Sequence, residues 1–276
     1  MPLYPLTLSP EDLSAALKLS NEPGWNQTTA DWSVFLEHGM VFGLKDGGTL
    51  IATSAILPYS SFGFVSMVLV TQKWRKRGLA TRLLEQAIMA LSARGLVPVL
   101  DATPAGAIVY ARRGFRSTFD LCRWERPEPT AVSAPKSRAP TRAVGMNELD
   151  GLARLDREAF GSDRRFLLQA FLQRPGTRAL LSQAGFVMTR KGHRAVQLGP
   201  LVADSEAAAI DLLAGAVAGL DGPVFLDVVE RWSELRNWLE ANDFHRQRPF
   251  QRMKLGDEIV FGRDNRLMVT AGPEFG

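Results

Sequence analysis

Cysteine and histidine are both scarce in this sequence of 276 residues. It contains one cysteine, Cys122, and three histidines, His38, His193 and His245. A single cysteine cannot form an internal disulfide, which is typical of a protein of the reducing cytoplasm, and we expect Cys122 to be an apolar filler on a strand. Because the histidines are scattered, they do not have the spacing of a zinc site. The sequence therefore predicts a cytoplasmic protein without a bound metal.

Long apolar runs are also missing. No run reaches the length of about 18 residues that a membrane-spanning helix needs. The first residues, Met-Pro-Leu-Tyr-Pro-Leu-Thr, lack a basic stretch followed by an apolar one, so we expect neither export nor membrane anchoring. The net charge of +4 suits an anionic ligand, but the excess is small and spread over both halves. We therefore expect no nucleic-acid partner.

The most informative stretch is an apolar segment that runs directly into a basic turn. The segment ends at Val68-Leu69-Val70, and apolar residues recur at helical spacing from Leu79 to Leu91. Between them lies the turn Arg75-Lys76-Arg77-Gly78-Leu79-Ala80-Thr81.

Gly78 lets the backbone of this turn approach a ligand, and the first amides of the following helix point outward as hydrogen-bond donors. The pattern indicates a cradle for a pyrophosphate that Arg75, Lys76 and Arg77 also hold. The alternative is a basic helix start that faces only water.

A proline-rich stretch divides the chain into halves of similar size. We predict a linker at residues 127–142, a first domain at 1–126 and a second at 143–276. A strand-like segment that ends in Leu-Asp precedes a helical stretch and a phenylalanine in each half, at Asp101 and Phe115 and again at Asp227 and Phe244. The halves therefore resemble duplicates.

The second half departs from the first at the basic turn. Its Pro200-Leu-Val202 segment is followed by a shorter turn that has no glycine and is acidic at Asp204 and Glu206. Carboxylates repel a pyrophosphate. We therefore expect the second copy to keep the scaffold without the anion site, with Trp232 and Trp238 filling its core.

Hydrophobic periodicity predicts a mixed α/β sheet for the first half. The expected strands are 3–8, 40–45, 49–58, 63–71, 97–101 and 115–124. The expected helices are 11–20, 28–38, 78–94 and 105–113. A hairpin turn is expected at Gly47-Gly48, and Gly114 stands where a helix C-terminal cap belongs.

Two motifs in these elements resemble the GNAT superfamily of acetyl-CoA-dependent N-acetyltransferases. Arg75-Lys-Arg-Gly-Leu-Ala80 matches its [Gln/Arg]-x-x-Gly-x-[Gly/Ala] signature, and Tyr110-Ala-Arg-Arg-Gly-Phe115 matches Tyr-x-x-x-Gly-Phe. The whole chain is similar to tandem GNAT proteins with a degenerate second copy. In the second half of this sequence, Leu239 occupies the position that matches Tyr110 when Phe244 is aligned with Phe115. The implied fold is α/β, with two GNAT-like mixed-sheet domains in tandem.

The resemblance implies roles in binding acetyl-CoA. Amides from Arg77 to Thr81 would bind the pyrophosphate, and the edge of strand 63–71, splayed from strand 97–101, would pair with the pantetheine arm. The amide of Val68 or Leu69 would donate to the developing oxyanion. The cofactor-binding residues implied are Val68, Leu69, Val70, Arg75, Lys76, Arg77, Gly78, Leu79, Ala80, Thr81, Thr103, Gly106 and Tyr110.

The same resemblance makes Tyr110 the donor of a proton to the departing thiolate. The alternative is a tyrosine packed between helix and sheet. Thr103 would contact the end of the cofactor or simply cap the following helix. The expected acceptor-site residues are Trp25, Asn26, Asp31, Asp163 and Arg164.

Other readings stay open for some of these residues. Trp25 would otherwise pack in the core, and Asp163 and Arg164 would otherwise cap the helix that begins near Arg165. No residue identifies itself as the general base, although Asp31, Glu37 and Asp101 are conceivable. Each of those carboxylates is more typical of a surface position or a cap.

The sequence thus predicts an N-acetyltransferase that uses acetyl-CoA and transfers the acetyl group directly to the amine of a small molecule or amino acid. The alternative is a non-catalytic acyl-CoA-binding sensor, and a third hypothesis is a nucleic-acid binder that uses Lys73 to Arg77. We expect a monomer or homodimer. The acceptor cannot be identified from the sequence, because one scaffold serves many substrates.

Overall fold

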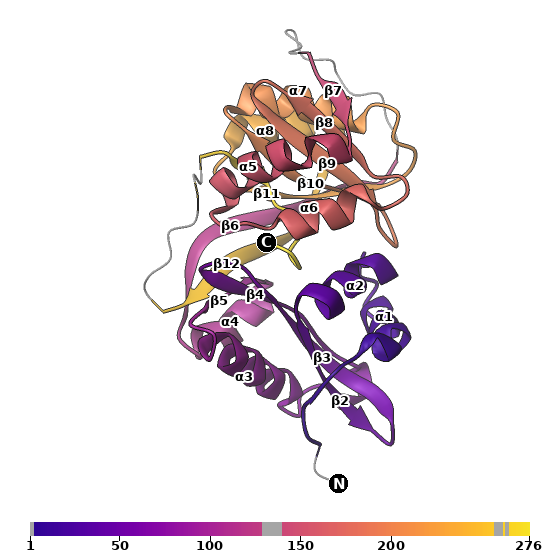
Figure 1. The fold of residues 1–276 in the computed structure, drawn as a ribbon, viewed down its shortest axis with the longest axis vertical. Helices are drawn as coiled ribbons and strands as arrows, with labels where there is room; N and C mark the ends of the chain where they lie inside the picture. Colours follow the sequence, from indigo (N-terminus) through magenta and orange to yellow (C-terminus); the bar gives the residue numbers. More distant parts are fainter. Residues whose placement is uncertain (1–2, 129–139, 257–261, 263–264) are drawn as a thin grey trace. The chain divides into compact units, whose positions relative to one another are not determined.

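The computed structural model describes residues 3–128, 140–256, 262 and 265–276 (Figure 1). It contains two compact units. The first unit runs to Leu100 and includes residues 192–194 and Phe275, and the second unit comprises residues 101–191, 195–274 and Gly276. The predicted linker at 127–142 lies largely outside the described residues.

The first unit is a five-stranded sheet with helices, in the order predicted from the sequence. Its sheet has the order β1-β2-β3-β4-β5, antiparallel except for the parallel pair β4 and β5. The strands are β1 (Leu6–Thr7), β2 (Met40–Asp46), β3 (Thr49–Pro58), β4 (Phe62–Val70) and β5 (Val97–Ala102). The helices are α1 (Leu13–Asn21), α2 (Thr29–His38) and α3 (Leu79–Ser92), with 3-10 turns η1 (Pro10–Asp12) and η2 (Gln72–Trp74).

The predicted first strand is shorter than expected. The sequence suggests residues 3–8, whereas only Leu6 and Thr7 pair with β2. Pro5 cannot donate a backbone hydrogen bond, so regular pairing begins only after it. The other helices and strands expected up to residue 126 are confirmed, within about two residues at most of their ends.

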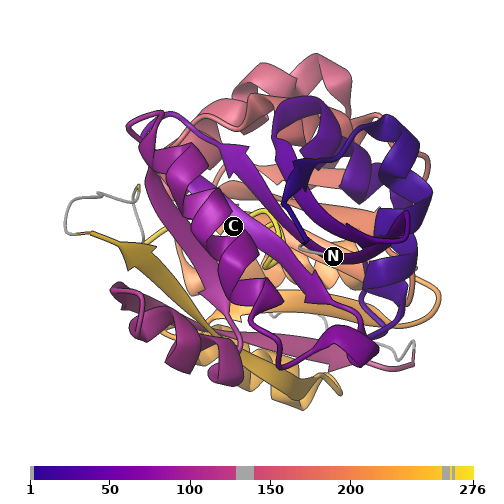
Figure 2. The same cartoon turned by 90° about the horizontal axis from the view of Figure 1, so that it is seen from below.

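Helix α3 packs against β3 and β4, and α1 and α2 also pack on this sheet (Figures 1 and 2). The buried side of α3 consists of the residues predicted from helical spacing, including Leu83, Leu84 and Leu91. Trp32 of α2 is fully buried and donates its indole N–H to the Ser20 hydroxyl over 3.0 Å. Full burial of a leucine side chain stabilises a fold by about 1.5–3 kcal/mol, so the buried leucines hold α3 against the sheet.

Strands β4 and β5 separate partway along their length. Their paired residues are Phe62 with Val97, Gly63 with Pro98 and Phe64 with Val99, whereas β4 continues to Val70. We call the space between β4 and β5 the first wedge, and residues 65–70 of β4, which lie beyond the last pair with β5, the edge of the first wedge.

A β-bulge lies within that edge. Ala55 of β3 pairs with Ser66, but Thr53 pairs with Leu69, and Met67 has a positive φ of 51°. The Thr53 hydroxyl donates to the Met67 carbonyl over 2.9 Å, which holds the bulge. Non-glycine residues with positive φ are uncommon and cluster at functional sites. The bulge re-aims the peptide groups next to Val68.

In the second unit the strands follow one another in the order β12-β6-β11-β13-β10-β9-β8-β7. The strands are β6 (Phe115–Arg126), β7 (Arg142–Val144), β8 (Arg178–Ser182), β9 (Gly185–Lys191), β10 (Val196–Ala203), β11 (Val224–Val229), β12 (His245–Leu255) and β13 (Leu267–Val269). The helices are α4 (Pro104–Ala111), α5 (Leu149–Phe160), α6 (Arg165–Leu172), α7 (Glu206–Val217) and α8 (Ser233–Ala241), with the 3-10 turn η3 (Met146–Glu148).

Strand β6 comes from the first half of the sequence but pairs with β11 and β12 of the second half. The compact units therefore do not follow the division of the sequence into two copies. Cys122 of β6 is buried in the core of the second unit, and burial raises the pKa of its thiol. This confirms the prediction that Cys122 is an apolar strand residue. Trp232 and Trp238 pack partly buried against the same core.

The second unit repeats the separation of two parallel strands. Val196, Gln197 and Leu198 of β10 pair with residues 224–226 of β11, and the strands then diverge. Here the short strand β13 lies between them. Val269 pairs with both Leu201 of β10 and Val228 of β11. We call the space between β10 and β11 the second wedge.

Within the described ranges, no helix is long and apolar enough to cross a membrane. In that same part of the chain, no group of three or more His, Cys, Asp or Glu side chains is placed to hold a metal ion.

Candidate functional site

The basic turn of the first unit ends in an open helix N-terminus. Gly78 is the N-cap of the 14-residue helix α3 and has a left-handed φ of 76°. A Cβ built on Gly78 would meet no atom within 4 Å, so the space in front of the helix is free. The first amides of a helix have no intrahelical partner and lie at the positive end of its dipole. This geometry can hold an anion.

Three exposed cations precede that helix: Arg75, Lys76 and Arg77. Arg75 donates its Nε–H to the Val70 carbonyl over 3.0 Å, and the Arg77 guanidinium lies 4.6 Å from the centroid of the Trp74 ring. Backbone and ring contacts thus orient two of the cations beside the helix N-terminus. Guanidinium groups bind phosphates in a bidentate manner, so the turn suits a ligand with several negative charges.

Glu22, just after α1, fixes the entry to this turn. Its carboxylate accepts from the Thr71 hydroxyl and from the Gln72 amide, both over 2.7 Å. These donors, the Thr71 hydroxyl first, hold the pKa of Glu22 below its usual value. Glu22 could not be found from the sequence alone, because it lies 49 residues before Thr71 and belongs to no local motif.

In the second unit, helix α4 presents Tyr110. Thr103 caps this helix by accepting from the Gly106 amide over 3.3 Å, and Pro104 occupies its first turn. A Cβ on Gly106 would lie only 3.0 Å from the Tyr110 ring, so glycine leaves room for that ring. The ring also packs on Phe115, with centroids 5.9 Å apart.

Burial raises the pKa of Tyr110, so its phenol keeps its proton throughout the neutral range. The side chain is nevertheless partly exposed. Tyr110 is therefore positioned by packing and still able to donate a proton.

Asp101 lies near the end of β5, and its side chain forms a buried ion pair. Its two carboxylate oxygens accept from Nε and Nη2 of Arg252 over 2.7 and 2.8 Å. Burial is the largest influence on this group and raises the pKa of Asp101, against the opposing effect of Arg252. Asp101 is one of the conceivable general bases, and both oxygens of its carboxylate are engaged by Arg252.

A cavity of about 330 Å³ opens beside the start of α4. Its polar wall contains two interacting pairs: Arg246 with Glu230 over 2.9 Å, and Gln251 with Asp120 over 3.1 Å. The remaining lining is mostly apolar and consists of Ala102, Pro104, Ala107, Leu121, Pro249 and Phe250.

The expected acceptor residues of the first unit have structural partners. Asn26 is buried, and its side-chain carbonyl accepts from the Arg194 amide over 2.9 Å. Asp31 forms a capping box at the start of α2, where it accepts from the amide and the hydroxyl of Thr28 over 2.7 and 2.8 Å. Trp25 is half-buried. Their role toward an acceptor stays a prediction.

Asp163 and Arg164 differ sharply in their surroundings. Asp163 is exposed and accepts from the Arg165 amide over 2.8 Å, which is the capping role proposed as its alternative. Arg164 is 1% exposed, forms a bidentate pair with Asp156 over 2.7 and 3.0 Å, and donates to the Gly276 carbonyl. Its guanidinium also lies 3.7 Å from the Phe160 ring centroid.

The predicted site residues thus form two groups. The first unit brings together the bulged edge of β4 and the basic turn, from Val68, Leu69 and Val70 to Thr81, and also holds Trp25, Asn26 and Asp31. The second unit holds Thr103, Gly106 and Tyr110 on one helix, and Asp163 and Arg164 before another.

The turn at the start of α7, which corresponds to the basic turn, is closed by its own side chains. The Ser205 hydroxyl accepts from the Ala208 amide over 3.2 Å, and Glu206 accepts from the Leu235 amide over 2.8 Å. Asp204 pairs with Arg266 over 2.7 Å. In the second copy, the position that corresponds to Tyr110 is occupied by Leu239, which is fully buried. That the second copy has no anion site stays a prediction.

Two family models match most of the chain. Residues 10–115 match the acetyltransferase (GNAT) family, and residues 152–268 match an acetyltransferase (GNAT) domain. The chain is 21% identical over 253 residues to YitH of Bacillus subtilis strain 168, an N-acetyltransferase described as uncharacterized, and the match covers 87% of each chain.

Solved structures show the same fold. A putative acetyltransferase from Pyrococcus horikoshii has a TM-score of 0.83 at 20% identity, with 99% of this chain and 96% of that one covered. A tandem GNAT protein from the clavulanic acid biosynthesis pathway has a TM-score of 0.66 at 14% identity, with 94% and 100% covered.

Proposed function

The chain belongs to the GNAT superfamily of N-acetyltransferases and is an acyltransferase with two GNAT domains in tandem; on this premise we propose that it uses acetyl-CoA to acetylate the amine of a small molecule or amino acid. We assign catalysis to the first copy, residues 1–126, and a structural or substrate-cleft role to the second, residues 143–276. The observation that carries this proposal is the open, cation-flanked N-terminus of α3 at Gly78.

The residues of the first unit fit a bound coenzyme A. A diphosphate would accept from the amides of residues 77–81 and from Arg75, Lys76 and Arg77. A side chain at residue 78 would project into the space that the diphosphate needs, and glycine leaves that space empty. The exposed cations supply charge of the required sign without any rearrangement of the buried core.

The edge of the first wedge fits the amide-rich pantetheine arm. Residues 65–70 of β4 extend beyond the last pair with β5, and such an edge binds an extended chain by main-chain hydrogen bonds. The second wedge supports this assignment, because an extended segment of the chain itself pairs there with β10 and β11.

When bound, acetyl-CoA supplies an activated thioester. The amide of Val68 or Leu69, next to the bulge at Met67, donates to the carbonyl oxygen as negative charge develops on it. Tyr110 donates its proton to the departing thiolate, and its raised pKa keeps that proton available at neutral pH. The acceptor amine must be neutral when it attacks. Because the single cysteine is buried in the core, we propose direct transfer without an acyl-cysteine.

The proposal is tested by measuring free-thiol release from acetyl-CoA with a panel of polyamines, amino acids and aminoglycosides. We expect amine-dependent thiol release with at least one class. Coenzyme A binding without any turnover would favour the sensor alternative. Oligonucleotide binding that falls steeply with salt and does not compete with coenzyme A would favour the nucleic-acid hypothesis.

A further inference from the structure

Strand β13 lies in the second wedge, between β10 and β11. It occupies the place that corresponds to the space between β4 and β5 in the first wedge. Both wedges begin with three paired residues and then a shift in the register of the neighbouring antiparallel strand. In the second wedge, Leu201 pairs with Val269 and Val202 with Leu267. A backbone hydrogen bond also fixes one end of the inserted segment, since the Thr270 amide donates to the Asp227 carbonyl over 3.0 Å.

Gly199 admits the inserted segment. A Cβ built on Gly199 would lie 2.0 Å from the Thr270 carbonyl oxygen, and its φ of +136° is one that side-chain-bearing residues rarely adopt. The close approach of two backbones therefore requires glycine at this position. The Ala203 amide donates to the Arg266 carbonyl over 3.0 Å, and the Trp232 indole donates to the Leu267 carbonyl over 2.8 Å.

The residues before the helix at the second wedge carry a negative charge, whereas those at the first wedge carry positive charges. Where the first copy has Arg75, Lys76 and Arg77 for an anion, the second has Asp204, which pairs with Arg266 over 2.7 Å. Glu158 pairs with the same guanidinium over 2.8 Å. An acidic helix start thus holds a cation that belongs to the inserted segment itself.

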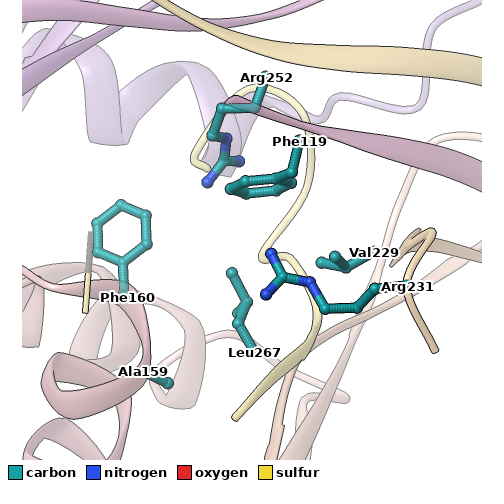
Figure 3. Close-up of a pocket in the computed structure, with 7 residues that line it drawn as sticks. All are labelled: Phe119, Ala159, Phe160, Val229, Arg231, Arg252 and Leu267. Carbon is teal, nitrogen blue, oxygen red and sulfur yellow. The ribbon is translucent and has the colours of Figure 1, made fainter. Parts of the chain in front are cut away.

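Little space remains in the second wedge. Met268 and Val269 are fully buried. A pocket beside Leu267, lined also by Phe119, Val229 and Phe160, has a volume of about 10 Å³ (Figure 3). That is room for about one water molecule and not for a pantetheine arm.

We propose that residues 266–270 are the resident ligand of the second wedge, an extended peptide that occupies the place where the first copy takes the pantetheine arm. The full chain then binds one coenzyme A, in the first copy alone. The stoichiometry rests on the proposed function of the first copy, whereas the occupation of the second wedge does not.

Two measurements on the full chain test this proposal. Native mass spectrometry with coenzyme A should detect one molecule per chain. Hydrogen exchange should show the amides of residues 267–270 as protected as those of β10 and β11. Two molecules of coenzyme A per chain, or exchange of residues 267–270 as fast as an exposed loop, would overturn the proposal. If no coenzyme A binds, the function proposed for the first copy fails, and hydrogen exchange still decides the occupation of the second wedge.

Gly199→Ala provides the matched perturbation. Gly222→Ala is its control, because Gly222 also has a positive φ, of 91°, but no atom lies within 4 Å of its built Cβ. Gly199→Ala should accelerate exchange of residues 267–270 at least about tenfold more than Gly222→Ala does. Equal effects would contradict the proposal. If Gly199→Ala does not fold, Arg266→Ala provides the same readout, with faster exchange confined to the inserted segment expected and unchanged exchange contradicting the proposal.

Discussion

Glu22 accepts a hydrogen bond from the Thr71 hydroxyl over 2.7 Å and thereby ties the end of α1 to the turn after β4. Because its other carboxylate oxygen accepts from the Gln72 amide, one side chain fixes two consecutive residues just before the basic turn. The turn is therefore held from outside its own sequence.

Glu22→Gln should lower the free energy of unfolding at neutral pH by less than about 1 kcal/mol, since the carboxylate is exposed and one of its two acceptors is lost. The folded-state pKa of Glu22 lies below its ordinary 4.5. The contribution is therefore present above pH 4.5 and disappears as the pH falls through the folded-state value. Urea unfolding from pH 7 downward measures it. The exposed Glu37→Gln is the control, and a wild-type advantage that grows on acidification would contradict the prediction.

Gly78→Ala and Gly95→Ala form a matched pair at the two ends of α3. Both glycines have positive φ, 76° and 67°, and neither built Cβ meets an atom within 4 Å. Both substitutions should cost about 1 kcal/mol of stability. Gly78→Ala should also weaken coenzyme A binding at least about tenfold, because the new methyl group enters the diphosphate site. Calorimetry measures both affinities, and equal dissociation constants would show that the diphosphate binds elsewhere.

Tyr110→Phe keeps the ring that packs on Phe115 and removes the phenolic proton. It should reduce kcat by about 10²-fold or more and leave the coenzyme A dissociation constant within about twofold of wild type. In the wild type, the tyrosine-dependent part of kcat should persist until the pH exceeds 10, because burial raises the Tyr110 pKa above that value. An unchanged kcat in the variant would refute the proton-donor role.

Arg164→Ala should cost about 3–5 kcal/mol, since it leaves the Asp156 carboxylate buried without the guanidinium that neutralises it. Asp163→Ala should cost only about 1 kcal/mol, as expected for an exposed capping residue. Denaturant unfolding distinguishes the two. An Arg164→Ala variant as stable as Asp163→Ala would show that the buried pair contributes little to stability.

Local patterns in the sequence were sufficient to predict much of the fold and the geometry of the basic turn. Helical spacing from Leu79 to Leu91 and the signature around Gly78 predict α3 and its N-terminus, and both are present. These features depend on residues close together in the chain. Thr103 as a helix cap is confirmed for the same reason.

Long-range partners could not be predicted in this way. Strand β13 has three residues, and its place depends on β10 and β11, which precede it by about 40 to 70 residues. The ion pair of Asp101 with Arg252 spans 151 positions. In both cases no local sequence pattern identifies the partner, because complementarity of charge and shape appears only after the sheet is assembled.

The most direct test is a crystal structure of the full chain grown with coenzyme A. We predict density for the diphosphate at the amides of residues 77–81, with Arg75 and Arg77 turned toward it and strand β13 still between β10 and β11. Density for the diphosphate at the start of α7, or a coenzyme bound away from α3, would contradict it.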